Sequence, residues 1–183
     1  MGQLILILGG ARSGKSAYGE RLARERGGAV LFVATATAGD DEMAQRIATH
    51  RAERPAAWRT LEAPTGVASA IATSGSAADT ILLDCVTLLV SNLLLAHEAE
   101  GEAAIGQAID AEFTALLARI DAAAAAWIVV SNEVGMGLVP PYPLGRAYRD
   151  LLGRVNARLA ARADRAYLLV AGLPLDLKRL MAD

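Results

Sequence analysis

Four residues near the start of the chain have the types and spacing of a phosphate-binding loop. Gly9, Gly14, Lys15 and Ser16 fit the pattern G-x-x-x-x-G-K-[ST], which here follows an apolar run. Glycines let backbone N–H groups turn toward phosphate oxygens, and a following helix directs its positive dipole end at them. The alternative is a glycine turn that only joins a strand to a helix. The strand–loop–helix context favours a nucleoside triphosphate site, in which Lys15 reaches the outer phosphates and Ser16 holds Mg²⁺.

An acidic residue ends the apolar run TILLD and is the second metal candidate. In phosphate-loop proteins a carboxylate at the end of a strand meets Mg²⁺ directly or through water. Aspartate is also favoured just before a helix, so helix capping is the alternative for Asp84. The phosphate loop upstream favours the magnesium role.

The segment GDDEMAQRIATHRAERP carries further residues that could do chemistry. Its acidic start and its final proline indicate a helix over residues 41–54. At helical spacing, one side of this helix carries Met43, Ile47, His50 and Arg54. Arg46 and Arg51 lie at the edges of that side. A histidine on an apolar stripe is more often a core residue than a catalytic one, but arginines make a poor core and a good cradle for phosphates. Both roles therefore stay open for His50 on this pattern.

The rest of the chain alternates short apolar runs with longer segments of helical period. Strands are expected at 3–8, 29–35, 80–84, 127–131 and 166–170, and helices at 15–26, 40–53, 86–97, 103–124 and 144–163. This alternation predicts an α/β fold with a mostly parallel sheet flanked by helices. Together with the phosphate loop, the fold class expected is that of the P-loop NTPases (RecA-like). Gly, Ser, Thr and Pro predict loose structure in 62–80 and 135–145, and the tail AGLPLDLKRL predicts a short hairpin strand at the sheet edge.

Composition limits the number of domains, the binding partners and the location that can be expected for the chain. Residues 1–183 are expected to form a single domain, since no linker or repeat divides them and 54% apolar residues are ample for a core. A formal net charge of −2 argues against a nucleic-acid-binding protein. The lone Cys85 and the lack of a basic region before the first apolar run indicate a cytoplasmic setting. The longest apolar stretch, 81–96, contains polar residues and is shorter than the roughly 20 apolar residues that span a bilayer, so no membrane span is expected.

Six segments together resemble the bifunctional adenosylcobinamide kinase and adenosylcobinamide-phosphate guanylyltransferase family of cobalamin biosynthesis. They are GGARSGKS, VATA, DDEMAQRIATHRAERP, WRTLE, ILLDCVT and SNEVGMGLVP, and the likeness runs nearly from end to end. The resemblance implies that ATP or GTP phosphorylates the aminopropanol hydroxyl of adenosylcobinamide. It then implies transfer of GMP from GTP to that phosphate through a guanylyl-histidine, which releases pyrophosphate and forms adenosylcobinamide-GDP.

When the functional residues of the family are transferred to the matching positions of this sequence, the resemblance implies that His50 takes GMP. Lys15 is then the second catalytic residue. The nucleotide contacts that it implies are Gly9, Gly10, Ala11, Arg12, Ser13, Gly14, Lys15, Ser16, Ala34, Thr35, Ala36, Arg51, Ala52, Glu53, Arg54, Glu62 and Asp84. Ser16 and Asp84 are the implied Mg²⁺ ligands, and the cofactors expected are GTP, ATP and Mg²⁺. Some relatives have a second histidine at the position of Thr49, whereas His97 lies outside the family motifs and is expected at the surface.

The same resemblance implies a homotrimer that binds the corrinoid between subunits, with Asn132 and Glu133 facing the substrate or a neighbouring subunit. Two other functions remain compatible with the phosphate loop. A small-molecule kinase would need no His50, and a regulatory nucleotide-binding module would bind GTP without turnover.

Overall fold

The computed structural model describes residues 2–39, 41–52, 54–75 and 77–180, without the side chains of residues 42, 43, 46, 47 and 50. The described residues form one seven-stranded sheet, in the order β3-β2-β4-β5-β1-β6-β7. The strands are β1 Leu4–Gly9, β2 Val30–Ala34, β3 Arg59–Glu62, β4 Thr80–Asp84, β5 Ala126–Val130, β6 Arg165–Val170 and β7 Leu173–Asp176. Every neighbouring pair is parallel except the antiparallel pair β6–β7. The expected α/β class and the hairpin strand at the sheet edge are confirmed.

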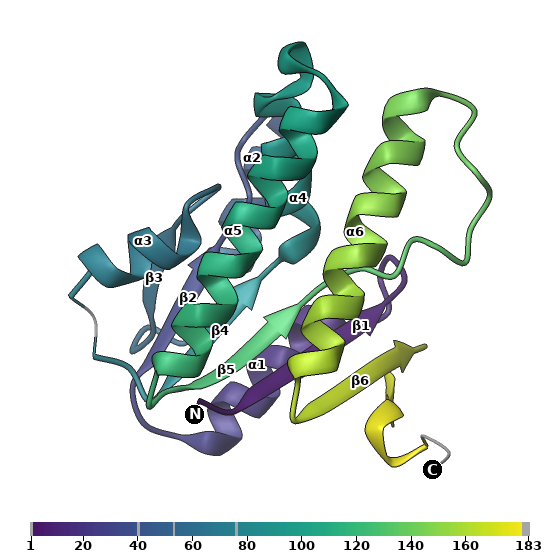
Figure 1. The fold of residues 1–183 in the computed structure, drawn as a ribbon. Helices are drawn as coiled ribbons and strands as arrows, with labels where there is room; N and C mark the ends of the chain where they lie inside the picture. Colours follow the sequence, from purple (N-terminus) through teal and green to yellow (C-terminus); the bar gives the residue numbers. More distant parts are fainter. Residues whose placement is uncertain (1, 40, 53, 76, 181–183) are drawn as a thin grey trace.

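Helices cover both faces of the sheet (Figure 1). They are α1 Lys15–Arg26, α2 Asp41–Ala52, α3 Val67–Thr73, α4 Val86–Ala96, α5 Glu102–Ala122 and α6 Pro143–Arg162, and short 3₁₀ turns lie at Glu98–Glu100 and Leu177–Arg179. Among the described helices, none has the length and apolar character needed to cross a membrane.

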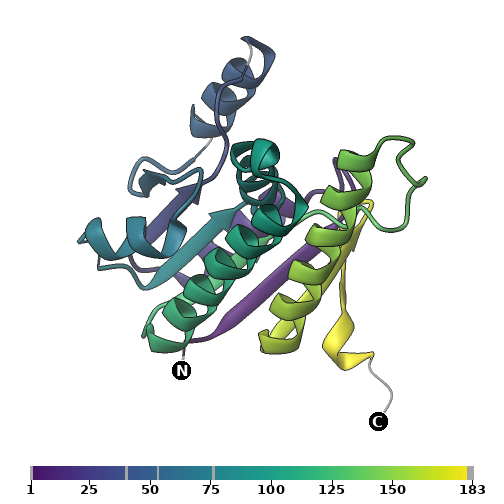
Figure 2. The ribbon, with the colours of Figure 1, turned by 45° about the horizontal axis from the view of Figure 1, so that its top comes forward.

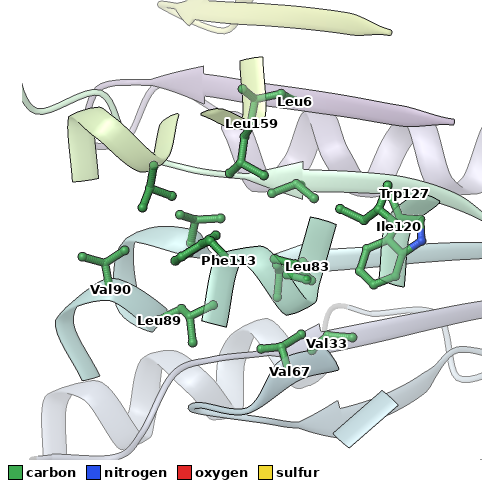
Figure 3. Close-up of a cluster of buried hydrophobic side chains, with 14 of the residues drawn as sticks. Leu6, Val33, Val67, Leu83, Leu89, Val90, Phe113, Ile120, Trp127 and Leu159 are labelled. Atoms are coloured by element: carbon green, nitrogen blue, oxygen red, sulfur yellow. The ribbon is translucent and has the colours of Figure 1, made fainter. Parts of the chain in front are cut away.

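Alternate residues of each central strand pack into two separate cores, because successive side chains point to opposite faces. In β1, Leu4, Leu6 and Leu8 belong to the larger core, which α3, α4, α5 and α6 cover. Ile5 and Ile7 belong to the smaller core under α1. Figure 3 shows the larger core, with Phe113 of α5 and Trp127 of β5 among side chains from the sheet. Burial on both faces explains why these strands are continuous apolar runs.

Two short elements lie where the sequence predicts loose structure or no element. The prediction of loose structure for 62–80 is wrong over α3, because Val67 and Ile71 are one helical turn apart and both are buried in the larger core. The edge strand β3 has a mostly exposed side-chain pattern, so it lacks the apolar run that marks the other strands. Helix α2 projects beyond the carboxyl edge of the sheet, apart from the packed layers (Figure 2).

Candidate active site

The phosphate loop, residues 9–16, joins the buried strand β1 to α1. A Cβ at Gly9, which has φ +155°, would lie 2.6 Å from both the Leu169 carbonyl oxygen and the Ser13 Oγ. Gly14 has φ +92° and is the N-cap of α1. Glycine is the residue that tolerates such backbone conformations and close approaches, so both positions require it.

Neighbouring segments hold the phosphate loop from two sides. The Glu133 N–H donates to the Gly9 carbonyl oxygen at 3.0 Å, from the segment that follows β5. The Gly172 N–H donates to the Ser13 carbonyl oxygen at 3.1 Å, from the turn between β6 and β7. The loop is therefore fixed in the sheet before any ligand binds.

Lys15 lies within the loop and is only 8% exposed. Its Nζ donates a hydrogen bond to the Gly10 carbonyl oxygen at 2.6 Å. Burial lowers the pKa of Lys15 from its ordinary value, while Cys85 and Asp84 act in the opposite direction. A poorly hydrated ammonium group beside backbone N–H groups is a strong attractant for phosphate oxygens.

The carboxyl ends of β2 and β4 place the next predicted residues side by side. Ala34 pairs with Asp84 in the sheet, and the Thr35 N–H donates to the Asp84 carbonyl oxygen at 3.3 Å. The Thr35 hydroxyl contacts the main chain of Cys85, at 2.9 Å from its nitrogen and 2.7 Å from its oxygen. These contacts hold Ala34 and Thr35 next to Asp84, and Ala36 follows Thr35 in the chain.

Arg54 lies against this group, beyond the end of α2. Its guanidinium carbon is 3.5 Å from the centre of the Phe32 ring, and its buried Nε has no hydrogen-bond partner among the described residues. Burial lowers the pKa of Arg54, and the charges of Asp84 and Glu20 oppose that effect. Asp84 thus acts electrostatically on both Lys15 and Arg54.

The prediction that Arg54 shares a helix face with His50 is wrong. Helix α2 ends at Ala52, and Pro55 disfavours helical backbone in the residue before it. The backbone of His50 lies in α2, but its side chain and all of Glu53 lie outside the described residues. Arg51 and Ala52 are exposed, and the Arg51 Nη1 is 3.4 Å from the Glu62 Oε1 at the end of β3.

Three other residues considered in the sequence analysis, His97, Thr49 and Asn132, make local contacts outside the group around Asp84. The ring of His97 lies 2.9 Å from the Glu100 carboxylate, and its side chain is 34% exposed, so it is half-buried rather than fully on the surface. Thr49 is exposed, and its hydroxyl bonds the Gln45 carbonyl within α2. The Asn132 N–H donates to the Thr87 hydroxyl at 2.8 Å, which fixes the start of the segment after β5.

Oxygen ligands for Mg²⁺ are available at two of the predicted positions. Ser16 and Asp84 are both partly exposed and offer a hydroxyl and a carboxylate. Among the described residues no group of three or more His, Cys, Asp or Glu side chains could hold a metal by itself. This donor set fits Mg²⁺, which commonly takes one or two protein oxygens and completes its shell with substrate phosphates and water.

A cavity beside the loop was not predicted from the sequence. It has a volume of about 390 Å³ and is lined by Gly10, Ala11, Arg12, Ser13, Glu133, Met136, Leu168, Leu169, Val170 and Ala171. Several of its walls are main chain and aliphatic side chains at the end of β6, and no residue type there signals binding. Its lining includes Gly10, Ala11, Arg12 and Ser13 of the loop and Glu133 of the NEVGMG segment, which were candidate residues, whereas residues 168–171 were not.

Comparisons with known proteins identify the family of the chain. Residues 5–177 match the model of a family described as cobinamide kinase / cobinamide phosphate guanyltransferase. The chain is 48% identical over 173 residues to the bifunctional adenosylcobalamin biosynthesis protein CobP of Pseudomonas aeruginosa, a match that covers 94% of this chain and 96% of that protein. It is 44% identical over 181 residues to the bifunctional adenosylcobalamin biosynthesis protein CobU of Salmonella typhimurium, covering 96% and 99%.

A solved structure shares the fold. It is a prototypical ATPase from the type III secretion system of pathogenic bacteria, with a TM-score of 0.53 and 14% identity, and the match covers 100% of this chain and 59% of that one. This likeness concerns the fold alone, since the chain shares the α/β arrangement of that ATPase. The family match and the two relatives go further, and show that the chain belongs to the cobinamide kinase / cobinamide phosphate guanyltransferase family.

Proposed function

We propose that this enzyme phosphorylates adenosylcobinamide with ATP or GTP and then guanylylates the product through a covalent intermediate on His50. Family membership supports the two activities. The observation that carries the assignment to this site is that the Asp84 carboxylate acts electrostatically on two cations, the buried Lys15 of the loop and the half-buried Arg54, whose guanidinium lies over the Phe32 ring of β2. Both reactions build negative charge on phosphate oxygens, and cations already fixed in place stabilise such charge.

In the kinase step the aminopropanol oxygen attacks the γ-phosphorus. The bond from the γ-phosphorus to the β–γ bridging oxygen breaks, the nucleoside diphosphate leaves, and the hydroxyl proton passes to water. Lys15 balances the charge that builds on the leaving oxygens, and the N–H groups of the loop hold the phosphate chain in line.

In the transfer step a neutral imidazole nitrogen of His50 attacks the α-phosphorus of GTP. The bond from the α-phosphorus to the α–β bridging oxygen breaks, and pyrophosphate leaves. A phosphate oxygen of adenosylcobinamide phosphate then attacks the same phosphorus, which breaks the P–N bond and frees His50. Arg54 and the exposed Arg51 are proposed to stabilise the charge on the α-phosphate.

Mg²⁺ is proposed to bind through Ser16 and Asp84. When bound, it supplies positive charge that neutralises the phosphate chain. Asp84 also acts through its own charge, because its carboxylate favours the protonated forms of Lys15 and Arg54.

A cytoplasmic homotrimer with the corrinoid between subunits is proposed as the working form. The segment after β5 supports an interface or substrate role, because Met136, Leu138, Val139 and Tyr142 are all more than half exposed. Apolar side chains gathered on one surface segment commonly mark a binding surface.

Product analysis tests the proposed function. Enzyme incubated with adenosylcobinamide, GTP and Mg²⁺ should yield adenosylcobinamide phosphate and adenosylcobinamide-GDP, separated and weighed by liquid chromatography and mass spectrometry. Arg54→Gln should slow the second product by about tenfold or more, since one charge-assisted contact is worth about 1.5–3 kcal/mol. Arg21→Gln on the exposed face of α1 is the control. If Arg54→Gln and the control form adenosylcobinamide-GDP at equal rates, Arg54 has no role in the transfer step.

A further inference from the structure

Asn92 is a polar residue on α4, a helix that packs firmly on the sheet through buried side chains such as Leu89 and Leu93. Its amide nitrogen donates two hydrogen bonds at 2.9 Å, one to the Thr35 carbonyl oxygen and one to the Pro64 carbonyl oxygen. Both partners are acceptors, and an asparagine amide carries its two donors on one nitrogen. Asn92 therefore joins two separate segments of the chain to one fixed helix.

The two carbonyl groups lie where the chain leaves the sheet. Thr35 directly follows β2, and Pro64 comes two residues after Glu62, the last residue of β3. The paired residues of β2 with β3 and β4 end one residue before Thr35. The Asn92 amide therefore continues to hold the backbone just beyond the hydrogen bonds of the sheet.

Helix α2, which carries His50, is attached to the molecule next to these two points. The chain runs from Thr35 through residues without regular structure to the start of α2 at Asp41. The helix projects beyond the carboxyl edge of the sheet, apart from the packed layers (Figure 2). Near its end the Arg51 Nη1 lies 3.4 Å from the Glu62 Oε1. The position of α2 thus depends on the backbone at Thr35 and at the end of β3, and Asn92 holds both.

The phosphate loop is held by other groups. The Glu133 N–H donates to the Gly9 carbonyl oxygen and the Gly172 N–H to the Ser13 carbonyl oxygen. These bonds come from segments that follow β5 and β6, whereas β2 and β3 lie on the far side of β4. Loss of the Asn92 amide should therefore shift α2 relative to the phosphate loop and leave the loop itself in place.

We propose that Asn92 is a positioning residue for the guanylyl-transfer step, in which it sets where α2 presents His50 to the α-phosphorus. The attack of a nucleophile on phosphorus tolerates little displacement, and a misplacement of about 1 Å can cost on the order of 100-fold in rate. The kinase step uses the phosphate loop and a hydroxyl of the corrinoid, so it should not depend on Asn92. This inference rests on the proposed function, in which His50 is the nucleophile.

Two substitutions remove the donors of Asn92 in different ways. Asn92→Ala deletes the amide and favours the helix, and Asn92→Leu keeps a side chain of similar size. The position is partly exposed, so folding should tolerate both. Asn156→Ala is the matched comparison, because the amide of Asn156 on α6 donates to the Asn132 carbonyl oxygen at 2.9 Å, in the segment that leads to the phosphate loop. Thermal unfolding of each variant sets the assay temperature, so that only folded enzyme is compared.

Two rates are measured in each variant. Protein labelling by GTP carrying ³²P at the α-position, followed in a single turnover over a range of GTP concentrations, gives a maximal rate and a half-saturating concentration. Phosphorylation of adenosylcobinamide is followed as the sum of adenosylcobinamide phosphate and adenosylcobinamide-GDP, separated by liquid chromatography and mass spectrometry. The ratio of the two rates separates a change in the position of α2 from a general loss of structure.

In both Asn92 variants the maximal labelling rate should fall by about tenfold or more, while the phosphorylation rate and the half-saturating GTP concentration stay within about threefold of wild type. Asn156→Ala should change both rates by a similar factor. Parallel loss of both rates in the Asn92 variants would show a general structural role and overturn the proposal, as would unchanged labelling. Wild-type enzyme that phosphorylates the corrinoid but takes up no label would instead contradict the proposed function.

Discussion

Gly9 and Gly10 are adjacent in the phosphate loop, but only Gly10 has room for a side chain. At Gly9 an added Cβ meets a backbone carbonyl at 2.6 Å, whereas at Gly10 no atom lies within 4 Å. Gly9→Ala is therefore expected to lower the free energy of unfolding by more than about 2 kcal/mol, and Gly10→Ala by less than about 0.5 kcal/mol. Urea unfolding at fixed protein concentration measures both, and equal losses would contradict the fixed position of the loop.

The thiol of Cys85 should be unreactive in the folded protein. Burial, and then the charge of Asp84, raise its pKa from 9.0 to about 11. Since the thiolate is the reactive form, alkylation by iodoacetamide near pH 8 should be more than about tenfold slower than in urea-unfolded enzyme. Intact mass measured over time follows the reaction, and comparable rates in the two states would be the contradicting result.

The same pKa shift predicts a pH dependence of stability. Between 9.0 and about 11 the unfolded thiol is ionised while the folded thiol keeps its proton. The folded state then binds more protons than the unfolded state, so stability should fall as pH rises through this window. Cys85→Ser lacks a group that ionises there. Thermal unfolding of wild type and variant across the window should therefore show a shallower decline in the variant, and identical slopes would argue against the shift.

At the scale of elements, the start of α3 depends on a side chain from another helix. The N–H groups of Gly66 and Val67 both donate to the Glu112 carboxylate of α5 at 2.8 Å, and the N-cap Gly66 has no side chain of its own to do so. Glu112→Ala should lower stability by about 1–2 kcal/mol and speed amide exchange in α3. Glu98→Ala, an exposed acid on the 3₁₀ turn, is the control. Unchanged exchange in α3 would contradict this capping role.

How far the sequence predicts these elements depends on whether each signal is local. The five central strands are apolar runs, and the phosphate loop is one contiguous motif, so both were predicted with nearly correct bounds. The start of helix α3 is stabilised by the distant Glu112, and β3 by pairing with β2, so the local signal of each is weak. The contact of Arg54 with Phe32 and the cavity beside the phosphate loop join segments far apart in the chain. Such features become visible only once the sheet order is known.

At the scale of the whole molecule, the proposed trimer predicts a measurable mass. Native mass spectrometry should give a species of three times 19.1 kDa, since the exposed apolar side chains after β5 favour association. The measurement is repeated at several protein concentrations to separate a defined oligomer from loose aggregation. A species of 19.1 kDa alone at every concentration would rule out the trimer and any corrinoid site between subunits.

The central claim is that one site carries out phosphoryl transfer and also forms a guanylyl-histidine at His50. The most direct measurement incubates the enzyme with Mg²⁺ and GTP labelled at the α- or the γ-phosphate. It compares wild type with His50→Ala and with His97→Ala, which removes the other histidine of the chain. An acid-labile, base-stable protein label from the α-position alone, present in wild type and His97→Ala and absent in His50→Ala, is the predicted result. Wild-type enzyme that binds GTP but takes up no label, or a His50→Ala variant that is labelled as strongly as wild type, would contradict the account.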